Sequence, residues 1–178
     1  MVMKILVALA ILAAVLAGVV ALQPSEFRVT RSAAIAAPPS AIFPHVNNLY
    51  HWKAWSPWAR LDPNAQETFE GPAEGKGAVM KWAGNKNVGE GAMTITESRQ
   101  DELVRFNLEF LKPFKGSNTA EFTFQPEDNQ TVVTWSMSGK NNFMGKAIGL
   151  FMNCDKMAGG QFEKGLANLK SVTETAKS

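Results

Sequence analysis

The chain has 178 residues, enough for one domain with a sizeable core, and 46% of its residues are hydrophobic. Its formal charge of +2 is too small to indicate a nucleic-acid-binding protein, and its basic residues are scattered along the sequence. The single cysteine, Cys154, excludes an internal disulfide, and the two histidines, His45 and His51, are too few for a dedicated metal site. We therefore expect no nucleic-acid partner, no metal and no cofactor.

Residues 1–23 are predicted to be an N-terminal transmembrane anchor or a signal segment. Residues 5–22 carry no charged or polar side chain, and as a helix they would be roughly 27 Å long, close to the ~30 Å hydrocarbon core of a bilayer. A cleaved signal peptide has a shorter apolar stretch and a small-x-small cleavage site, so the uncleaved anchor is favoured. Lys4 predicts a cytoplasmic N-terminus with the domain on the periplasmic or extracytoplasmic side, although Arg28 and Arg31 weaken this assignment.

Residues 24–26 are a short polar linker, and the predicted domain covers residues 27–178. Its first element, residues 27–35, alternates apolar and polar side chains, which is typical of a half-buried strand. Pro38 and Pro39 then suit the first turn of a helix, and Pro44 interrupts that helix. We expect one short helix, a break, and a second short helix that reaches about Trp55.

Three of the five tryptophans, Trp52, Trp55 and Trp58, follow one another at a spacing of three. Pro57 restricts Ser56 to extended geometry, so Trp52 and Trp55 can share a helical face while Trp58 belongs to the loop that follows. These side chains either plug a core or form the rim of a cavity, and the two interpretations are compatible.

Residues 66–140 are predicted to form about six antiparallel strands separated by turns. The glycine pairs in this region, Gly75 with Gly77 and Gly89 with Gly91, indicate turns and bulges rather than a nucleotide-binding loop. Trp82 lies on a strand, as a core or cavity-wall side chain. Period-two alternation places one almost purely apolar set on the inner face of the sheet, namely Phe106, Leu108, Phe110, Phe122, Phe124, Trp135 and Met137.

The last segment, from about Met144 to Val172, has the spacing of a single long helix. Gly159 and Gly160 indicate a bend or a point of close approach within it. One stripe of this helix carries Ile148, Phe151, Asp155, Gly159, Phe162, Leu166 and Leu169. Asp155 is the single acid on the stripe. It either faces a cavity, where it could orient a ligand or act as an acid or base, or lies at the flank, where it pairs with a surface lysine or caps a backbone group.

The element order predicts an α+β fold in which one antiparallel sheet is covered by one long helix. A strongly curved sheet that wraps around this C-terminal helix cannot be filled completely by it. A cavity between the two is therefore expected.

This chain resembles the START-like (SRPBCC) superfamily, in its polyketide cyclase/dehydrase-like branch, over roughly residues 27–170. The resemblance is carried by "FRVTRSAAIAAPPSAIFPHVNN", "WKAWSPWARLDP", "WAGNKNVGEGAMTITES", "TVVTWSMSG" and "MNCDKMAGGQFEKGLANLK". It implies a helix-grip fold. Members include carriers of lipids and other hydrophobic ligands as well as cyclases, so the fold does not decide between binding and catalysis.

The apolar inner face favours binding, because cyclase-type members place polar and acid/base groups inside the cavity. We expect a membrane-tethered domain that binds a small hydrophobic molecule or lipid. Its cavity would be lined by Trp52, Trp55, Trp58, Trp82, Phe106, Leu108, Phe110, Phe122, Phe124, Trp135, Met137, Phe151, Asp155 and Phe162. Two alternatives stay open: a cyclase or dehydrase-type enzyme that acts on a hydrophobic substrate, with Asp155 as its candidate catalytic residue, and a structural or partner-binding domain with a filled core.

Overall fold

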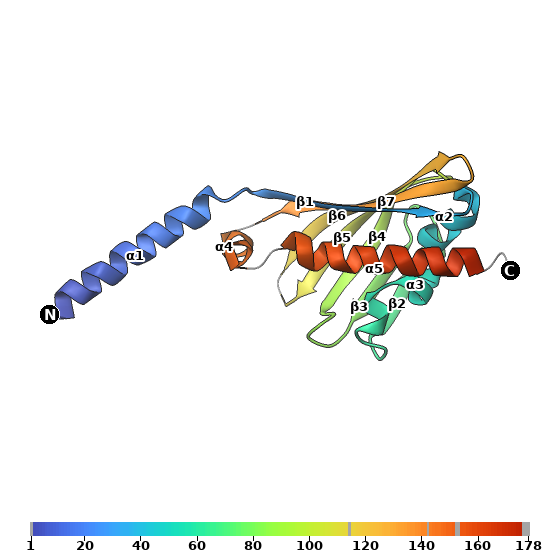
Figure 1. The fold of residues 1–178 in the computed structure, drawn as a ribbon. Coiled ribbons are helices and arrows are strands. Elements are labelled where there is room, and N and C mark those ends of the chain that lie inside the picture. Colours follow the sequence, from blue (N-terminus) through green and yellow to red (C-terminus); the bar gives the residue numbers. More distant parts are fainter. Residues whose placement is uncertain (1, 114, 142, 152–153, 176–178) are drawn as a thin grey trace.

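A computed structural model describes residues 2–113, 115–141, 143–151 and 154–175, without the side chains of residues 144, 148, 151 and 154. The described chain forms a seven-stranded antiparallel sheet with the strand order β1-β7-β6-β5-β4-β3-β2, and a long C-terminal helix crosses its inner face (Figure 1). The strands are β1 (Glu26–Ile35), β2 (Gln66–Glu70), β3 (Val79–Ala83), β4 (Glu90–Arg99), β5 (Leu103–Lys112), β6 (Gly116–Glu127) and β7 (Gln130–Lys140). This α+β helix-grip arrangement confirms the predicted fold class.

The helices lie at the ends and on the inner face of the sheet (Figure 1). They are α1 (Val2–Leu22), α2 (Pro39–Asn47), α3 (Trp52–Trp55), α4 (Phe143–Phe151) and α5 (Cys154–Thr175), with two short 3-10 helices, η1 (Leu49–His51) and η2 (Trp58–Arg60). Helix α1 extends away from the sheet at one end, and α2 and α3 lie at the opposite end (Figure 1). We call the first end of the sheet the α1 end and the second the α2 end.

The sequence analysis predicted that Pro44 interrupts the first short helix, and this prediction is wrong. Helix α2 continues through Pro44 to Asn47, and the chain turns at Asn48, whose side chain accepts a hydrogen bond from the Tyr50 amide at 3.0 Å. Pro44 has no backbone N–H, so it removes one helical hydrogen bond from α2 without ending the helix. The predicted limit of the second short helix at Trp55 is confirmed.

The prediction of one helix from Met144 to Val172 is wrong, because the structure has two helices, α4 and α5, in this region. Helix α5 continues through Gly159 and Gly160. Gly159 is instead a point of close approach, since a Cβ atom on it would overlap the guanidinium of Arg31 on β1. The glycine therefore lets the helix lie close against an arginine on the edge strand.

The core lies between the inner face of the sheet, α5 and the short helices. Trp52 and Trp55 are buried, and their indole N–H groups donate to the carbonyl oxygens of Val46 and His45, each at 2.9 Å. On α5, Phe162, Leu166 and Leu169 are buried against the sheet. The helical stripe predicted from the sequence thus faces the core along this part of α5.

Candidate functional site

Trp135 on β7 lies at the centre of the aromatic side chains between the sheet and α5. Its ring stacks on Phe162 of α5, with centroids 4.1 Å apart and planes 8° apart, and on Phe122 of β6, with centroids 4.7 Å apart. The three tryptophans of the short helices meet it edge-on: the centroid distances from Trp135 are 6.1 Å for Trp52, 5.8 Å for Trp55 and 5.6 Å for Trp58. Such T-shaped and stacked pairs are the favoured aromatic geometries.

The indole N–H of Trp135 has no hydrogen-bond partner among the residues that the structure describes, although the side chain is only 3% exposed. Trp52 and Trp55 differ in this respect, because both donate to backbone carbonyls. A buried donor without an acceptor costs roughly 1–3 kcal/mol relative to a satisfied one. Trp135 therefore places an unused donor at the centre of the expected ligand site.

The remaining predicted cavity residues divide between the two ends of the sheet. Phe124 lies toward the α2 end, where its ring meets Phe43 at a centroid distance of 5.6 Å. Toward the α1 end the inner face is only half-buried, and Trp82 contacts Phe110 there at 6.0 Å. This half-buried apolar band comprises Phe27, Met80, Trp82, Leu108, Phe110 and Met137. Phe106 belongs to the buried centre, and the side chain of Phe151 lies outside the described part.

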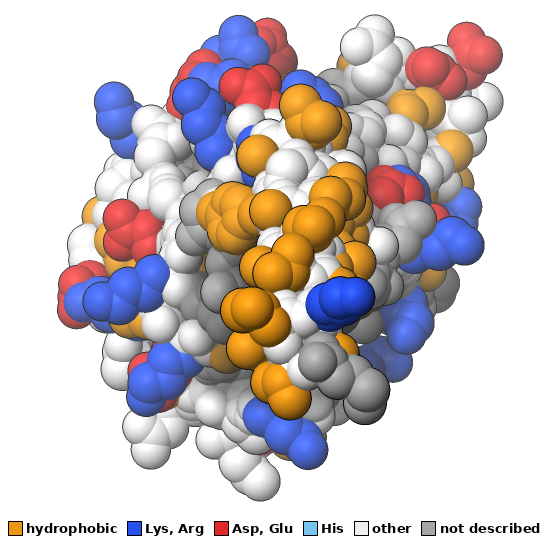
Figure 2. Space-filling model, turned by 90° about the vertical axis from the view of Figure 1, so that its left-hand side faces the viewer, with side chains coloured by type: hydrophobic (Ala, Val, Ile, Leu, Met, Phe, Trp, Pro, Cys, Tyr) orange, Lys and Arg blue, Asp and Glu red, His pale blue; other side chains and the backbone are white. Residues whose placement is uncertain are grey.

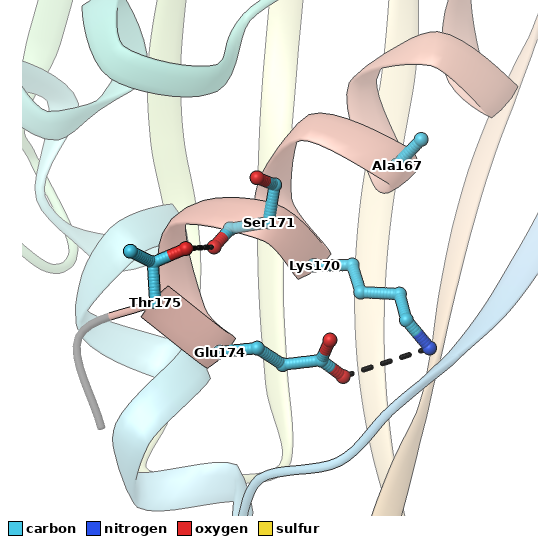
Figure 3. A pocket seen from close by; sticks show the side chains of 5 residues that line it. All are labelled: Ala167, Lys170, Ser171, Glu174 and Thr175. Atoms are coloured by element: carbon cyan, nitrogen blue, oxygen red, sulfur yellow. Dashed lines mark hydrogen bonds and ion pairs between the residues drawn. The ribbon is translucent and has the colours of Figure 1, made fainter. Parts of the chain in front are cut away.

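Two hollows of about 430 Å³ each lie on the surface of the described chain, and neither is lined by the predicted cavity residues. One is lined by Ala167, Lys170, Ser171, Glu174 and Thr175 near the end of α5, where Lys170 and Glu174 form an ion pair at 3.5 Å (Figure 3). The other is lined by His45, Tyr50, His51, Lys53 and Ala54. Between the sheet and α5, the described aromatic side chains pack against one another.

The two histidines are neighbours at the second hollow, with ring centroids 5.8 Å apart. Burial lowers the pKa of His45, and the nearby His51 lowers it further. His45 is therefore neutral at physiological pH. Among the described residues there is no cluster of three histidine, cysteine or acidic side chains that could hold a metal ion.

Asp155 lies at the start of α5 and is paired with an arginine rather than with the lysine that the sequence had suggested. Arg31 Nη2 is 3.0 Å from the Asp155 carboxylate, and Arg31 Nε donates to Glu163 at 2.7 Å. The hydrogen bond from Arg31 lowers the pKa of Asp155, and the side chain is 56% exposed. Asp155 is thus an ionised partner of Arg31, which argues against a role as a proton donor at neutral pH.

Arg31 was missed by the sequence analysis, although a signal for it was present. The alternation of β1 places Arg31 on the same face as Val29 and Ala33, which is the face that α5 covers. A basic side chain at an inward position requires an acidic partner on the covering element. Asp155 and Glu163 supply that partner from α5.

The neighbouring glycines of α5 give a direct test of this contact. Gly160→Ala is expected to raise the free energy of unfolding by about 0.5–1 kcal/mol, because its Cβ would meet open space and alanine is the better helix former. Gly159→Ala gains the same helix propensity, but its Cβ would overlap the Arg31 guanidinium and displace it from Asp155 and Glu163. We therefore expect its thermal midpoint to lie below that of Gly160→Ala by several degrees. Equal midpoints for the two variants, measured by circular dichroism, would contradict this assignment of Gly159.

The comparisons with known proteins agree on the fold. The profile of the family described as polyketide cyclase / dehydrase and lipid transport matches residues 26–174. Solved structures with similar folds include protein CV1439 from Chromobacterium violaceum, at 13% identity and a TM-score of 0.60, covering 85% of this chain and 99% of that one. No curated protein matches the chain.

Two further solved structures have a comparable likeness. Protein Ms6760 from Mycobacterium smegmatis is 18% identical with a TM-score of 0.59, covering 85% of this chain and 92% of that one. A protein of unknown function from Staphylococcus aureus, SA2116, is 11% identical with a TM-score of 0.63, covering 85% of this chain and 96% of that one. At these identities the likeness establishes the fold and leaves the ligand open.

Proposed function

Because the chain belongs to the polyketide cyclase / dehydrase and lipid transport family, we propose that it binds a small hydrophobic molecule or lipid between the sheet and α5. We further propose that α1 tethers this binding domain to a membrane. Helix α1 is long and apolar enough to cross a bilayer, and all of its described residues except Val20 are exposed. A signal sequence would have the same properties, so retention of α1 in the mature chain is part of the proposal.

The unpartnered indole N–H of Trp135 is the observation that carries the proposed site. The side chains around it are apolar, as in most sites for small hydrophobic molecules, which add a few polar groups to fix the ligand's orientation. A ligand with one polar acceptor, such as a carbonyl, hydroxyl or carboxylate oxygen, would satisfy the Trp135 donor while its apolar part contacts Phe122 and Phe162. The family and this donor together favour an amphiphilic ligand with a large apolar part.

The interior must open before such a ligand can enter, because the aromatic rings contact one another. Trp58 is the tryptophan best placed to move: it is only half-buried and lies on η2, while its ring contacts both Trp135 and Phe162. Trp52 and Trp55 are fixed by hydrogen bonds to α2. In the proposed mechanism, Trp58 swings away from Trp135 and the ligand takes its place beneath α5.

The test is native mass spectrometry of residues 24–178, which contain the whole matched region, purified from cells without detergent. A stoichiometric hydrophobic molecule that co-purifies, identified after organic extraction, would support the proposal and reveal the ligand class. A domain that is empty and also fails to bind fatty-acid and aromatic probes would rule it out.

The position of the ligand can be tested by the five indole N–H resonances in ¹⁵N-correlated NMR spectra. On addition of the extracted ligand, the Trp135 resonance is expected to move most and to gain protection from solvent exchange, because its donor acquires an acceptor. Trp52 and Trp55 serve as internal controls, since their donors are already satisfied. Binding without a change at Trp135 would place the ligand elsewhere.

A partner-binding domain with a filled core is the second candidate. The stack of Trp135 on Phe162 and the edge contacts of three tryptophans favour it, because these rings leave the centre closely packed. The two candidates differ in what the purified domain contains. An empty domain that captures no hydrophobic probe is the result expected of the second.

A further inference from the structure

Lysines that are far apart in the sequence are brought together at the α1 end of the domain. They lie in the β3–β4 loop, at the junction of β5 and β6, at the end of β7, and in the first turns of α4 and α5. These residues are Lys86, Lys112, Lys115, Lys140, Lys146 and Lys156. The acids at this end are Glu26, Asp62, Glu90 and Asp155. Glu90 pairs with Lys112, Asp155 pairs with Arg31, and Asp62 accepts a hydrogen bond from the Asn85 amide of the β3–β4 loop. The α1 end is therefore positively charged.

The α2 end has the opposite character. Its turns, at residues 71–78, 100–102 and 127–130, carry Glu74, Asp101, Glu102, Glu127 and Asp128. The basic side chains at this end are Lys53 on α3, Lys76, and Arg99 at the end of β4, which pairs with Glu102 at 3.9 Å. The net charge of +2 thus conceals a separation of charge along the strands. A domain of this kind has a preferred orientation in the field of a charged surface.

Exposed apolar side chains accompany the lysines at the α1 end. Leu111 at the end of β5, Phe143 at the start of α4 and Met157 in α5 are 53%, 57% and 57% exposed. Seen from this side, α1 projects toward the viewer and its exposed hydrophobic side chains run through the middle of the view, with lysine and arginine side chains of the domain around it (Figure 2). Exposed apolar groups next to basic ones are typical of protein segments that lie in a lipid headgroup layer.

The chain connection fixes the same end close to the end of α1. Only residues 23–25 separate α1 from β1, and three extended residues reach at most about 11 Å. Helix α4 packs against α1, and Lys146 on α4 donates to the carbonyl oxygen of Ala21 at 3.2 Å. If α1 crosses a bilayer, α4 and the lysines must lie at its surface.

We propose that the α1 end of the domain docks on anionic phospholipid headgroups of the membrane that α1 crosses, with α4 in the headgroup layer. This inference rests on the tethering part of the proposed function and is independent of ligand binding. The lysines supply the attraction, and the exposed Leu111, Phe143 and Met157 supply apolar contact. The acidic α2 end then points away from the bilayer.

The test uses the full chain in nanodiscs of phosphatidylcholine alone or of equal parts phosphatidylcholine and phosphatidylglycerol. In a Cys154→Ser background, Asn87→Cys labels the α1 end and Asn129→Cys labels the α2 end, each with a fluorophore. A nitroxide-headgroup lipid in the disc reports proximity by quenching. In the anionic discs we expect strong quenching at residue 87 and weak quenching at residue 129, and less of both at high salt.

A matched pair of charge reversals tests the role of the lysines. Lys115→Glu with Lys140→Glu is expected to lower the ratio of docked to undocked domain by about thirtyfold or more, because each basic residue at an anionic surface contributes about fivefold. Lys53→Glu with Lys76→Glu changes the net charge equally but lies toward the α2 end, and should leave quenching at residue 87 unchanged. Circular dichroism spectra of both variants are the control for folding.

Each remaining outcome counts against a specific part of the proposal. A chain that does not remain with the discs overturns the tethering on which docking depends. A chain that remains, but shows the same quenching in neutral and anionic discs, overturns docking alone. Ligand retention, measured separately by native mass spectrometry, is not affected by either result, so failure of the ligand site can be distinguished from failure of docking.

Discussion

Replacement of Phe122 by alanine is expected to lower the free energy of unfolding by about 3–5 kcal/mol. Phe122 on β6 is fully buried, and its ring contacts four other aromatic rings, those of Trp52, Trp55, Phe106 and Trp135. The substitution removes the ring on which Trp135 stacks and leaves a cavity that the surrounding rings, held by the sheet and by α3, can fill only in part.

Denaturant unfolding followed by tryptophan fluorescence and circular dichroism measures this loss. Tyr50→Ala is the control, because Tyr50 is 55% exposed and its ring stacks on one neighbour, Phe69. Its cost should be about 0.5–1.5 kcal/mol, the range for one aromatic pair. A Phe122 variant no less stable than the Tyr50 variant would show that the aromatic centre is not the main core of the domain.

Replacement of Gly165 by valine is expected to destabilise the domain by about 1–3 kcal/mol through overpacking. Gly165 is buried on α5, and a Cβ there would lie 2.7 Å from Cζ3 of Trp135 and 3.1 Å from Cδ of Pro57. Neither neighbour can move freely, since Trp135 is held between Phe122 and Phe162 and Pro57 is buried. The added side chain must therefore push α5 away from the sheet.

Gly160→Val on the same helix is the matched control, because a Cβ at Gly160 meets no atom within 4 Å. It should leave the stability unchanged or raise it slightly, as valine is a better helix former than glycine. The same variants bear on the proposed ligand site, since Gly165→Val adds atoms beside Trp135 and is expected to weaken ligand binding, whereas Gly160→Val is not. Equal stability of both variants would argue that α5 is not seated closely on Trp135.

The strands could be predicted from the sequence because their alternation is strong. In β5 and β6 the same side chains that the pattern placed inward, such as Phe106 and Phe122, are buried in the structure. The division of this region into α4 and α5 was not predicted, because the apolar spacing of the sequence continues from one helix into the other. Periodicity indicates which face is buried but does not indicate whether the helix is continuous.

The candidate site was harder to predict than the fold. Alternation identified the inner face, but it could not show that Trp135 and Phe162 stack or that the rings fill the centre, because side-chain packing depends on contacts between distant segments. Asp155 was placed on the correct helix but its partner, Arg31, lies 124 residues earlier. The sequence also could not predict that Lys86, Lys115 and Lys140 lie at one end of the domain. They come from the β3–β4 loop, the β5–β6 loop and the end of β7, which only the folded sheet brings to the same end.

The three-residue connection between α1 and β1 limits what a tethered domain can do. A protein that shuttles cargo across the gap between two membranes needs a tether as long as that gap, and the effective concentration at a distant acceptor is close to zero when the linker cannot reach it. With α1 in the bilayer, this domain could exchange a ligand only within its own membrane or with a partner that comes to it. A domain tethered in this way would bind its ligand at one membrane surface and would not carry it between two membranes.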